Sequence, residues 1–289
     1  MFVIIGYVLV FASVIGGFLM AGGHVAALIQ PAELVIIGGA AVGAFVVSNS
    51  PKTIKAVFRG MPGIFKGSKF TKQLYIDLLS MLYDMLSKCR KEGLMSIETD
   101  IDAPNDSKLF AKHPTILADH HAMEFVCDYM RLLVGGSMNA MQVENLMDIE
   151  IETHHHEAEQ VPHAIARLAD GLPAFGIVAA VMGVVHTMES VGLPPAELGK
   201  LIAAALVGTF IGILLSYGLV SPIAALLTHK AEESTKMLQC IKVVLLANMH
   251  NYPPQVAVEF GRKVLYSTER PDFKELEDAI RNQKAQAPG

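Results

Sequence analysis

Two apolar stretches decide the fold of this chain: LPAFGIVAAVMGVVHTM at residues 172–188 and LIAAALVGTFIGILLSYGLVSPIAALL at residues 201–227. Neither stretch contains an Asp, Glu, Lys or Arg residue. A helix of about 20 residues spans the roughly 30 Å hydrocarbon core of a bilayer, so each stretch is long enough to cross a membrane. The chain is therefore predicted to be a membrane protein built around this pair of helices.

Small and hydroxyl-bearing residues recur at steps of three and four along both stretches, which places them on one face of each helix. They are Pro173, Gly176, Ala180, Gly183 and Thr187 in the first stretch and Ala205, Thr209, Gly212 and Ser216 in the second. Lipid gains nothing from small residues, whereas a neighbouring helix can pack closely against them. Both helices are therefore predicted to face protein over much of their length, and these faces to receive the helix of a partner.

Charge is distributed in blocks along the 289 residues. Of the 23 Lys and Arg residues, none precedes Lys52 and only Lys200 lies between residues 171 and 229, which leaves 22 for residues 52–170 and 230–289. This alternation predicts a polytopic membrane protein with two substantial aqueous parts. The net charge of −5 argues against a nucleic-acid binder, because such proteins need an excess of basic residues.

Two further apolar runs, residues 2–20 and 34–47, predict a first membrane hairpin. Six basic residues between Lys52 and Lys72 follow directly. By the positive-inside rule they place residue 51 onward in the cytoplasm. All four spans then fit a single orientation, with both termini in the cytoplasm.

The sequence thus predicts an all-α fold: a polytopic membrane protein with four transmembrane helices and a helical cytoplasmic domain. Apolar residues at helical spacing, such as Leu78, Met81, Leu82 and Met85, indicate helices in the aqueous part. A long acidic helix, from about residue 137 to 170, is expected to continue into the third span. The predicted divisions are residues 1–50 for the first hairpin, 51–170 for the cytoplasmic domain, 171–228 for the channel-lining hairpin and 229–289 for a cytoplasmic helical tail.

Several residue clusters permit chemistry but are better explained without it. The run His154–His156 lies among glutamates, but adjacent helical side chains point about 100° apart, so an exposed polar helix face is predicted instead of a metal site. Cys127 lies near His120 and His121 but has no orienting third group, so a thiol hydrolase is the weakest functional hypothesis. Free thiols in a reducing compartment are predicted for Cys89, Cys127 and Cys240.

The lack of ionisable residues at depth in the two long apolar stretches is more informative than these clusters. Membrane proton relays normally use an ionisable residue at depth, and the two small-residue stretches have none. Glu33 and Glu189 lie near the ends of predicted spans. Thr209 is the deepest side-chain hydroxyl of the fourth span, and it either bonds a backbone carbonyl of its own helix or forms part of a pathway wall. If the chain helps to conduct an ion, a partner must therefore supply the acid.

The same stretches resemble a known family. Residues 172–186, residues 207–222, the segment AVEFGRKVLYSTERP at 257–271 and residues 93–102 are similar to the MotA-type stator subunits of flagellar motors, within the MotA/TolQ/ExbB proton channel superfamily. The resemblance extends over nearly the whole chain, in the same four-span order.

This resemblance implies a five-membered ring of such subunits in the bacterial inner membrane, around a dimer of a MotB-like, peptidoglycan-anchored B-type subunit that supplies a conducting Asp. Ion flow would then move the ring against the switch ring of the rotor. Arg90 and Glu98 match the rotor-contact charges of the family, although on composition alone they form a solvated turn around Gly93. Pro173 and Pro222 match the prolines that couple conduction to movement.

Thr209 matches the hydroxyl that faces the Asp of the B-type subunit. The wall of the channel is accordingly predicted to comprise Ala180, Thr209, Gly212 and Ser216. The sodium-driven branch has a Thr at the position of Ala180 and a second Thr at the position of Gly208, so the resemblance implies proton drive over sodium drive. It implies contact with membrane lipid but no enzyme activity, no metal and no cofactor.

A second hypothesis is an energising proton-channel subunit of a TolQ/ExbB-like envelope transport complex, which makes no rotor contact. Those relatives have three spans, so the first hairpin of this chain argues against them. Loss of swimming with an intact flagellum would select the stator hypothesis, whereas loss of envelope integrity or siderophore uptake would select the alternative.

Overall fold

The computed structural model describes residues 2–65 and 67–286, with side chains as far as residue 282. Every regular element in these residues is a helix, which confirms the all-α prediction. The chain forms two compact units, one of residues 1–67 and 158–230 and one of residues 68–157 and 231–289. This division follows contacts, whereas the four divisions made from the sequence follow compartments and stay predictions. Lys66 and residues 287–289 lie outside the described residues.

The first unit contains the membrane spans. Its elements are α1 (Phe2–Met20), η1 (Val25–Leu28), α2 (Pro31–Ser48), α3 (Pro51–Gly60), η2 (Met61–Phe65), the second part of α8 (Ala140–Glu189), α9 (Pro195–Ile213), the π-helical segment η6 (Leu214–Val220) and the start of α10 (Ser221–Met249). Among the described residues, four helical stretches are long and apolar enough to cross a membrane, as predicted. The second begins earlier than the predicted 34–47, because Pro31 fits the first position of a helix.

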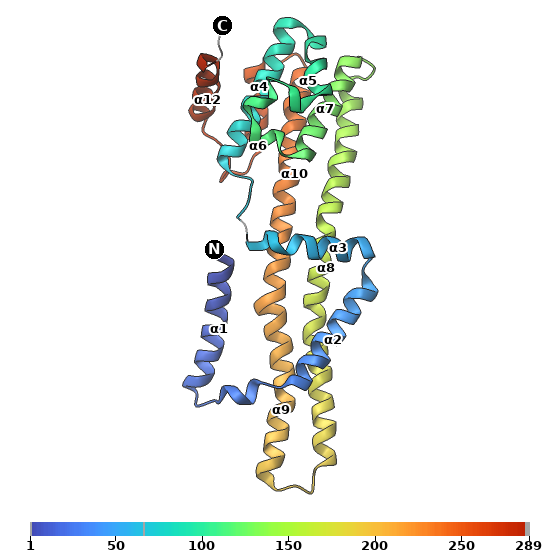
Figure 1. The fold of residues 1–289 in the computed structure, drawn as a ribbon, viewed down its shortest axis with the longest axis vertical. Coiled ribbons are helices and arrows are strands. Elements are labelled where there is room, and N and C mark those ends of the chain that lie inside the picture. Colours follow the sequence, from blue (N-terminus) through green and yellow to red (C-terminus); the bar gives the residue numbers. More distant parts are fainter. Residues whose placement is uncertain (1, 66, 287–289) are drawn as a thin grey trace. The chain divides into compact units, whose positions relative to one another are not determined.

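Within this unit α8 and α9 run antiparallel, and α2 packs against α9 (Figure 1). Ile37 and Ala41 of α2 form a buried cluster with Leu172, Ala179 and apolar residues of α9. Figure 1 also shows that α2 begins part-way along α9, with the turn between α8 and α9 lying beyond that point. Residues at the start of α2 can therefore reach the inner part of the α8–α9 pair.

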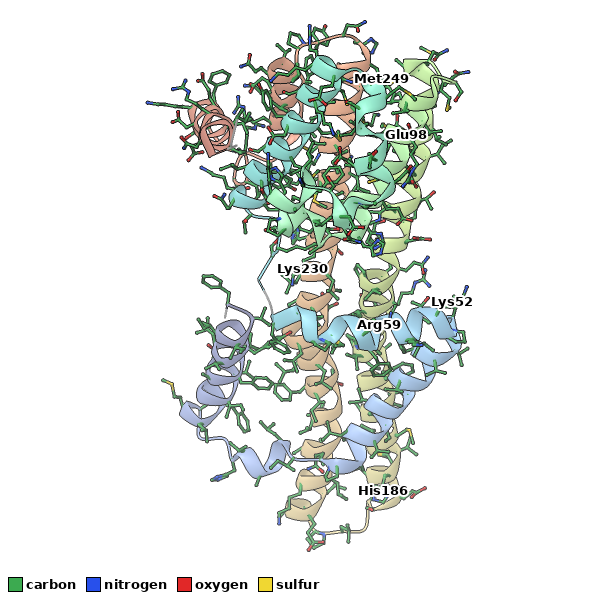
Figure 2. All side chains as sticks on the ribbon, turned by 45° about the horizontal axis from the view of Figure 1, so that its top comes forward. Lys52, Arg59, Glu98, His186, Lys230 and Met249 are labelled. Carbon is green, nitrogen blue, oxygen red and sulfur yellow. The ribbon has the colours of Figure 1, made fainter. Side chains whose placement is uncertain are left out.

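The short helix α3 has a buried apolar face and an exposed basic face. Ser50 caps its N-terminus by accepting a hydrogen bond from the backbone N–H of Thr53 at 3.2 Å. Val57 is buried against α8 and α10, whereas Lys52 and Arg59 are exposed (Figure 2). The helix is therefore amphipathic, as expected of a segment at a membrane surface.

The second unit is a helical domain with its own apolar core. Its elements are α4 (Lys72–Glu92), η3 (Leu94–Ile97), α5 (Glu98–Asp102), η4 (Pro104–Asp106), η5 (Phe110–Lys112), α6 (Pro114–Leu117), α7 (His120–Gly135), the first part of α8, the second part of α10, α11 (Pro254–Val264) and α12 (Phe273–Gln286). Leu78, Met81, Leu82 and Met85 are fully buried in this core, which confirms the helical spacing that predicted α4.

Helix α8 runs unbroken for 50 residues and contains both Pro162 and Pro173. The prediction of one helix that continues into the third span is therefore confirmed. The helix of the fourth span runs through η6 and α10 to Met249, and a new helix starts at Pro254 because a proline cannot continue the hydrogen-bond ladder.

One prediction for this domain is wrong. His154 and His155 were expected on an exposed helix face, but both are half-buried and face α10. The Nε2 atom of His154 lies 2.9 Å from Oγ of Ser234, and Nδ1 of His155 lies 3.2 Å from Oγ1 of Thr235. The polar histidines are paired with hydroxyl groups of a neighbouring helix, a contact between residues that lie far apart in the sequence.

Candidate functional site

The small residues of α8 and α9 bring the two backbones into direct contact. A Cβ atom placed on Gly176 would lie 2.9 Å from the carbonyl oxygen of Gly208 and 3.1 Å from Cα of Gly212. One placed on Gly212 would lie 2.7 Å from the carbonyl oxygen of Leu172. One on Gly183 would lie 2.7 Å from Cβ of Ala205. These residues therefore pack the two spans of a single chain against each other, which is the usual role of small residues in membrane helices.

The residues predicted to line a channel do not all share one environment. Gly212 and Ser216 are buried within the unit, whereas Ala180 and Thr209 are half-buried. Thr187 donates its hydroxyl hydrogen to the carbonyl oxygen of Gly183 at 2.8 Å. Thr209 makes no such bond to any residue that the structure describes. Its hydroxyl is thus available to a partner, and the lining of a pathway by these four residues stays a prediction.

The fourth span widens directly before Pro222. Residues Leu214–Val220 form a π-helical segment in place of the α-helix that the sequence predicted. Proline has no N–H to donate and its ring clashes with the preceding turn, so a local widening on its N-terminal side is an expected response. The hydroxyl of Tyr7 on α1 donates a hydrogen bond to the carbonyl oxygen of Leu219 at 2.9 Å. The first span therefore satisfies a carbonyl in the widened segment, a contact that sequence analysis missed.

The two prolines predicted to couple conduction to movement lie in different settings. Pro173 is half-buried inside the continuous helix α8, and Pro222 is exposed at the second position of α10. Ser216, within the widened segment, is 1% exposed and its hydroxyl has no hydrogen-bond partner among the described residues. The π-helical segment is the irregular part of these two spans, and π-helical turns occur frequently at functional sites.

Glu33 contradicts the expectation that no acid of this chain lies at depth. It is the third residue of α2, yet it is only 8% exposed and its Oε2 atom has no hydrogen-bond partner in the described part of the chain. A Cβ atom on Gly208 would lie 2.6 Å from this oxygen, and one on Gly183 would lie 3.6 Å from Oε1. The carboxyl group is therefore inserted between α8 and α9. One feature of the sequence could have identified Glu33 as a site residue: it is the first charged residue of the chain and lies between two apolar runs.

Arg90 and Glu98 lie on the second unit, on either side of a sharp turn. Arg90 is in the last turn of α4, Glu98 begins α5, and Gly93 between them has a φ of +89°, which favours glycine. Both charged side chains are exposed, and neither pairs with any described residue. Glu98 is labelled in Figure 2. Lys88 of α4 is paired instead and donates to Asp100 of α5 at 2.6 Å, whereas Lys91 and Glu92 are exposed like Arg90. The turn is thus fixed by internal pairs while two opposite charges stay available to a partner.

Cys127 does not support a thiol hydrolase. The side chain is 3% exposed, and burial raises the pKa of its thiol to about 11. A thiol acts as a nucleophile only as the thiolate, so a buried thiol with a raised pKa is inert near neutral pH. Among the described residues, no group of three or more His, Cys, Asp and Glu side chains is placed to hold a metal ion.

Comparison with known proteins agrees with the arrangement of spans. Residues 4–93 match the family model of the motility protein A N-terminal region, and residues 118–240 match that of the MotA/TolQ/ExbB proton channel family. The chain is 54% identical to Motility protein A of Salmonella typhimurium over 97% of this chain and 95% of that protein. The chain belongs to the motility protein A family. The Escherichia coli member is 53% identical over the same share of both chains.

Two solved structures of stator complexes are similar to this family member. The flagellar MotAB stator complex from Bacillus subtilis has a TM-score of 0.72 at 25% identity and covers 89% of this chain and 92% of its own. The C. jejuni MotAB structure has a TM-score of 0.75 over 92% of this chain and 95% of its own, and its 20% identity makes it evidence for the fold alone. The match to the N-terminal motility model covers the first hairpin, so the TolQ/ExbB-like alternative is not favoured.

Proposed function

We propose that this chain is the ring-forming stator subunit of a bacterial flagellar motor, which together with a B-type, peptidoglycan-anchored partner converts proton flow into torque on the rotor. The observation that carries this proposal is its 54% identity to Motility protein A over nearly its full length. The similarity to a MotAB stator complex supports a MotB-like partner dimer and a homo-oligomer, for which we propose a pentamer. The function is transport and mechanical coupling, without enzymatic catalysis.

The transported ion in this proposal is the proton. Ala180 is half-buried and has no hydroxyl to coordinate a sodium ion, whereas the resemblance implies a Thr there in sodium-driven relatives. Thr209, with a hydroxyl that no described residue engages, is the group of this chain that would face the conducting Asp of the partner.

The orientation in this proposal places both termini in the cytoplasm of a multi-pass inner-membrane protein. The exposed basic residues of α3 support it, because Lys and Arg near span ends are retained on the cytoplasmic side. The domain that carries Arg90 and Glu98 is then cytoplasmic, where a rotor would be accessible.

Arg90 and Glu98 are the proposed rotor contacts. Their exposure and lack of internal ion pairs support this role, since a charge already paired within its own domain has less to gain from a partner. Opposite charges on either side of one turn also favour one docking orientation, because electrostatic complementarity sets register as well as association rate.

Pro173 and Pro222 are the proposed coupling residues. Pro173 lies in α8, which begins in the second compact unit, and Pro222 lies in α10, which ends in that unit. The widened segment before Pro222 supports a local change of helical hydrogen bonding there, and a chain-continuous helix would pass that change toward the domain with Arg90 and Glu98.

The decisive experiment is deletion of the chain in its host, followed by complementation, with swimming scored and filaments counted by electron microscopy. We expect cells that keep their filaments but do not swim, and full recovery with the intact chain. A second arm reconstitutes vesicles with the chain alone and with its B-type partner, and follows internal pH. Uptake that requires both supports the proposal. Deleted cells that swim normally, or that lose envelope integrity with swimming intact, would overturn it.

A further inference from the structure

Glu33 is a buried acid without a partner inside the membrane unit. Four buried polar side-chain atoms of the described residues lack a hydrogen-bond partner, and Oε2 of Glu33 is the only carboxyl oxygen among them. An unpaired ionised carboxylate is costly in an apolar environment, and membrane spans retain such residues chiefly where they carry ions or protons. The enclosed carboxyl group is thus in a setting that needs an explanation beyond packing.

The position of this carboxyl group is deep relative to both neighbouring helices. Gly208, next to Oε2, is eight residues beyond Lys200, the last charged residue of α9 before the apolar part, and this corresponds to about 12 Å along the helix axis. Gly183, next to Oε1, is six residues before Glu189, or about 9 Å. With Lys200 and Glu189 taken as the edge of the hydrocarbon core, the carboxyl group lies about a third of the way into a bilayer that is roughly 30 Å thick.

The space around the carboxyl group is made by glycine. Oε2 of Glu33 would lie 2.6 Å from a Cβ atom at position 208, so any larger residue there would displace the carboxyl group from its present position. After Oε2, the atoms nearest to a Cβ at position 208 are Cβ of Ala179 at 3.1 Å and the backbone N of Ala180 at 3.2 Å, neither of which carries a charge. The titratable groups of this unit on the elements around Glu33 comprise His24 before α2, four residues at the far end of α8, and four residues near the turn between α8 and α9: Glu159, His163, Arg167 and Asp170, and His186, Glu189, Glu197 and Lys200. Glu33 forms no hydrogen bond or ion pair with any of them.

Two opposing influences act on the charge of this group. Enclosure between apolar helices favours the neutral acid. The first turn of α2, where Glu33 lies, favours the carboxylate, because the free N–H groups and the dipole of a helix N-terminus stabilise negative charge. A group held between these influences can take either form, which is the requirement for a proton carrier.

We propose that Glu33 is a proton-binding site in the spans of this chain, which exchanges protons on the outer part of the path that leads to the acid of the partner. Uptake forms an O–H bond on Oε2 with a proton from water, and release breaks that bond and gives the proton to a water molecule or a carboxylate further along. No redox change is involved. The proposal rests on the proposed function for the direction of flow, but proton binding at Glu33 can be measured without any flow.

The test uses the full chain with its B-type partner and three variants. Glu33→Gln keeps the shape but cannot ionise, Glu33→Asp keeps the acid, and Glu197→Gln is a matched control that removes an exposed carboxylate at the start of α9. Membrane level and partner pull-down are measured first. Infrared spectra recorded across a pH titration then follow the carboxyl C=O band, and vesicles report proton uptake.

We expect one component of the carboxyl C=O band, resolved as the difference between the unmodified and variant spectra on acidification, to be absent from Glu33→Gln and shifted in Glu33→Asp. Glu197→Gln should keep this component and lose a different one, that of an exposed acid. Proton uptake should fall on the order of 100-fold in Glu33→Gln, as when a positioned proton-transfer group is removed. An assembled Glu33→Gln complex that keeps the Glu33 component, or that conducts at the rate of the unmodified complex, would overturn the proposal. If Glu33→Gln does not assemble, an unshifted component in Glu33→Asp has the same consequence. An unmodified complex that shows the Glu33 component but conducts nothing would refute the proposed function and leave this inference standing.

Discussion

Substitution of Gly212 by Ala tests whether α8 and α9 are held together by backbone contact. The added methyl group would lie 2.7 Å from the carbonyl oxygen of Leu172 and 2.9 Å from Cα of Gly176. Both obstacles are backbone atoms, so no side-chain rotation can remove them. Ordinary close C···O contacts begin at about 3.3 Å, which requires the helices to separate by about 0.6 Å at this point.

The magnitude follows from two opposing effects. A gap of about 0.5–1 Å forfeits a quarter to a half of each dispersion contact across it, and overpacking of this kind costs about 1–3 kcal/mol. Ala is a better helix former than Gly by about 1 kcal/mol, which partly offsets the cost. We therefore expect a net destabilisation of up to about 2 kcal/mol for Gly212→Ala, and of about 1–3 kcal/mol relative to a Gly→Ala change in the same helix that makes no clash.

Gly199 provides the matched control, because it lies in the same helix and has no atom within 4 Å of its Cβ position. Gly199→Ala should keep the helix-propensity gain and avoid the clash. The assay is thermal unfolding of the purified chain in detergent, where 1 kcal/mol corresponds to about 2–4 °C for a protein of this size class. Gly212→Ala should have a lower Tm than the unmodified chain, and Gly199→Ala an equal or higher one. Equal Tm values for the two variants would refute the backbone contact.

Three further predictions follow from the exposed charges, the widened span and the buried thiols. Neutralisation of Arg90 or Glu98 alone should weaken swimming only partly, because exposed charge pairs contribute about 0–1 kcal/mol. Reversal of both charges should abolish swimming unless the matching charges on the rotor are reversed too. Unchanged swimming after the double reversal would mean that the two residues only form a solvated turn. Pro222→Ala should leave membrane level and partner pull-down near normal while swimming falls sharply, and failure to accumulate would make this proline structural. Since the Cys127 pKa of about 11 leaves roughly one thiol in a thousand ionised at pH 8, alkylation of the native chain should be far slower than after unfolding, and equal rates would contradict its burial.

Much of the fold could be predicted because its signals are local. Charge blocks and uninterrupted apolar runs define the four spans, since a charge inside a bilayer is costly wherever the rest of the chain lies. Helical spacing placed Leu78 and Met85 in the core of α4, and the two prolines at 253–254 ended α10. None of these inferences required knowledge of which helices are neighbours.

The environment of individual polar side chains could not be predicted, because it depends on those neighbours. His154 was expected in solvent, and its pairing with Ser234 follows from the packing of α8 against α10. Tyr7 and Leu219 are more than 200 residues apart, so no local pattern links the first span to the widened part of the fourth. The chemistry of each residue type was correct in these cases, but the neighbour that satisfies it was unknown.

Glu33 shows why sequence position is a poor measure of depth in a membrane unit. Depth was counted along α2, where Glu33 is near the start, but α2 begins part-way along α9, so the same carboxyl group lies inside the α8–α9 pair (Figure 1). The small residues of α8 and α9 therefore have two roles within one chain. Gly176 and Gly212 allow the two helix backbones to touch, and Gly208 leaves room for the carboxyl group of Glu33. Of the predicted wall, only Ala180 and Thr209 retain half-exposed surface. If these residues line the proposed path, the partner helix must therefore lie on the side of the α8–α9 hairpin that carries them.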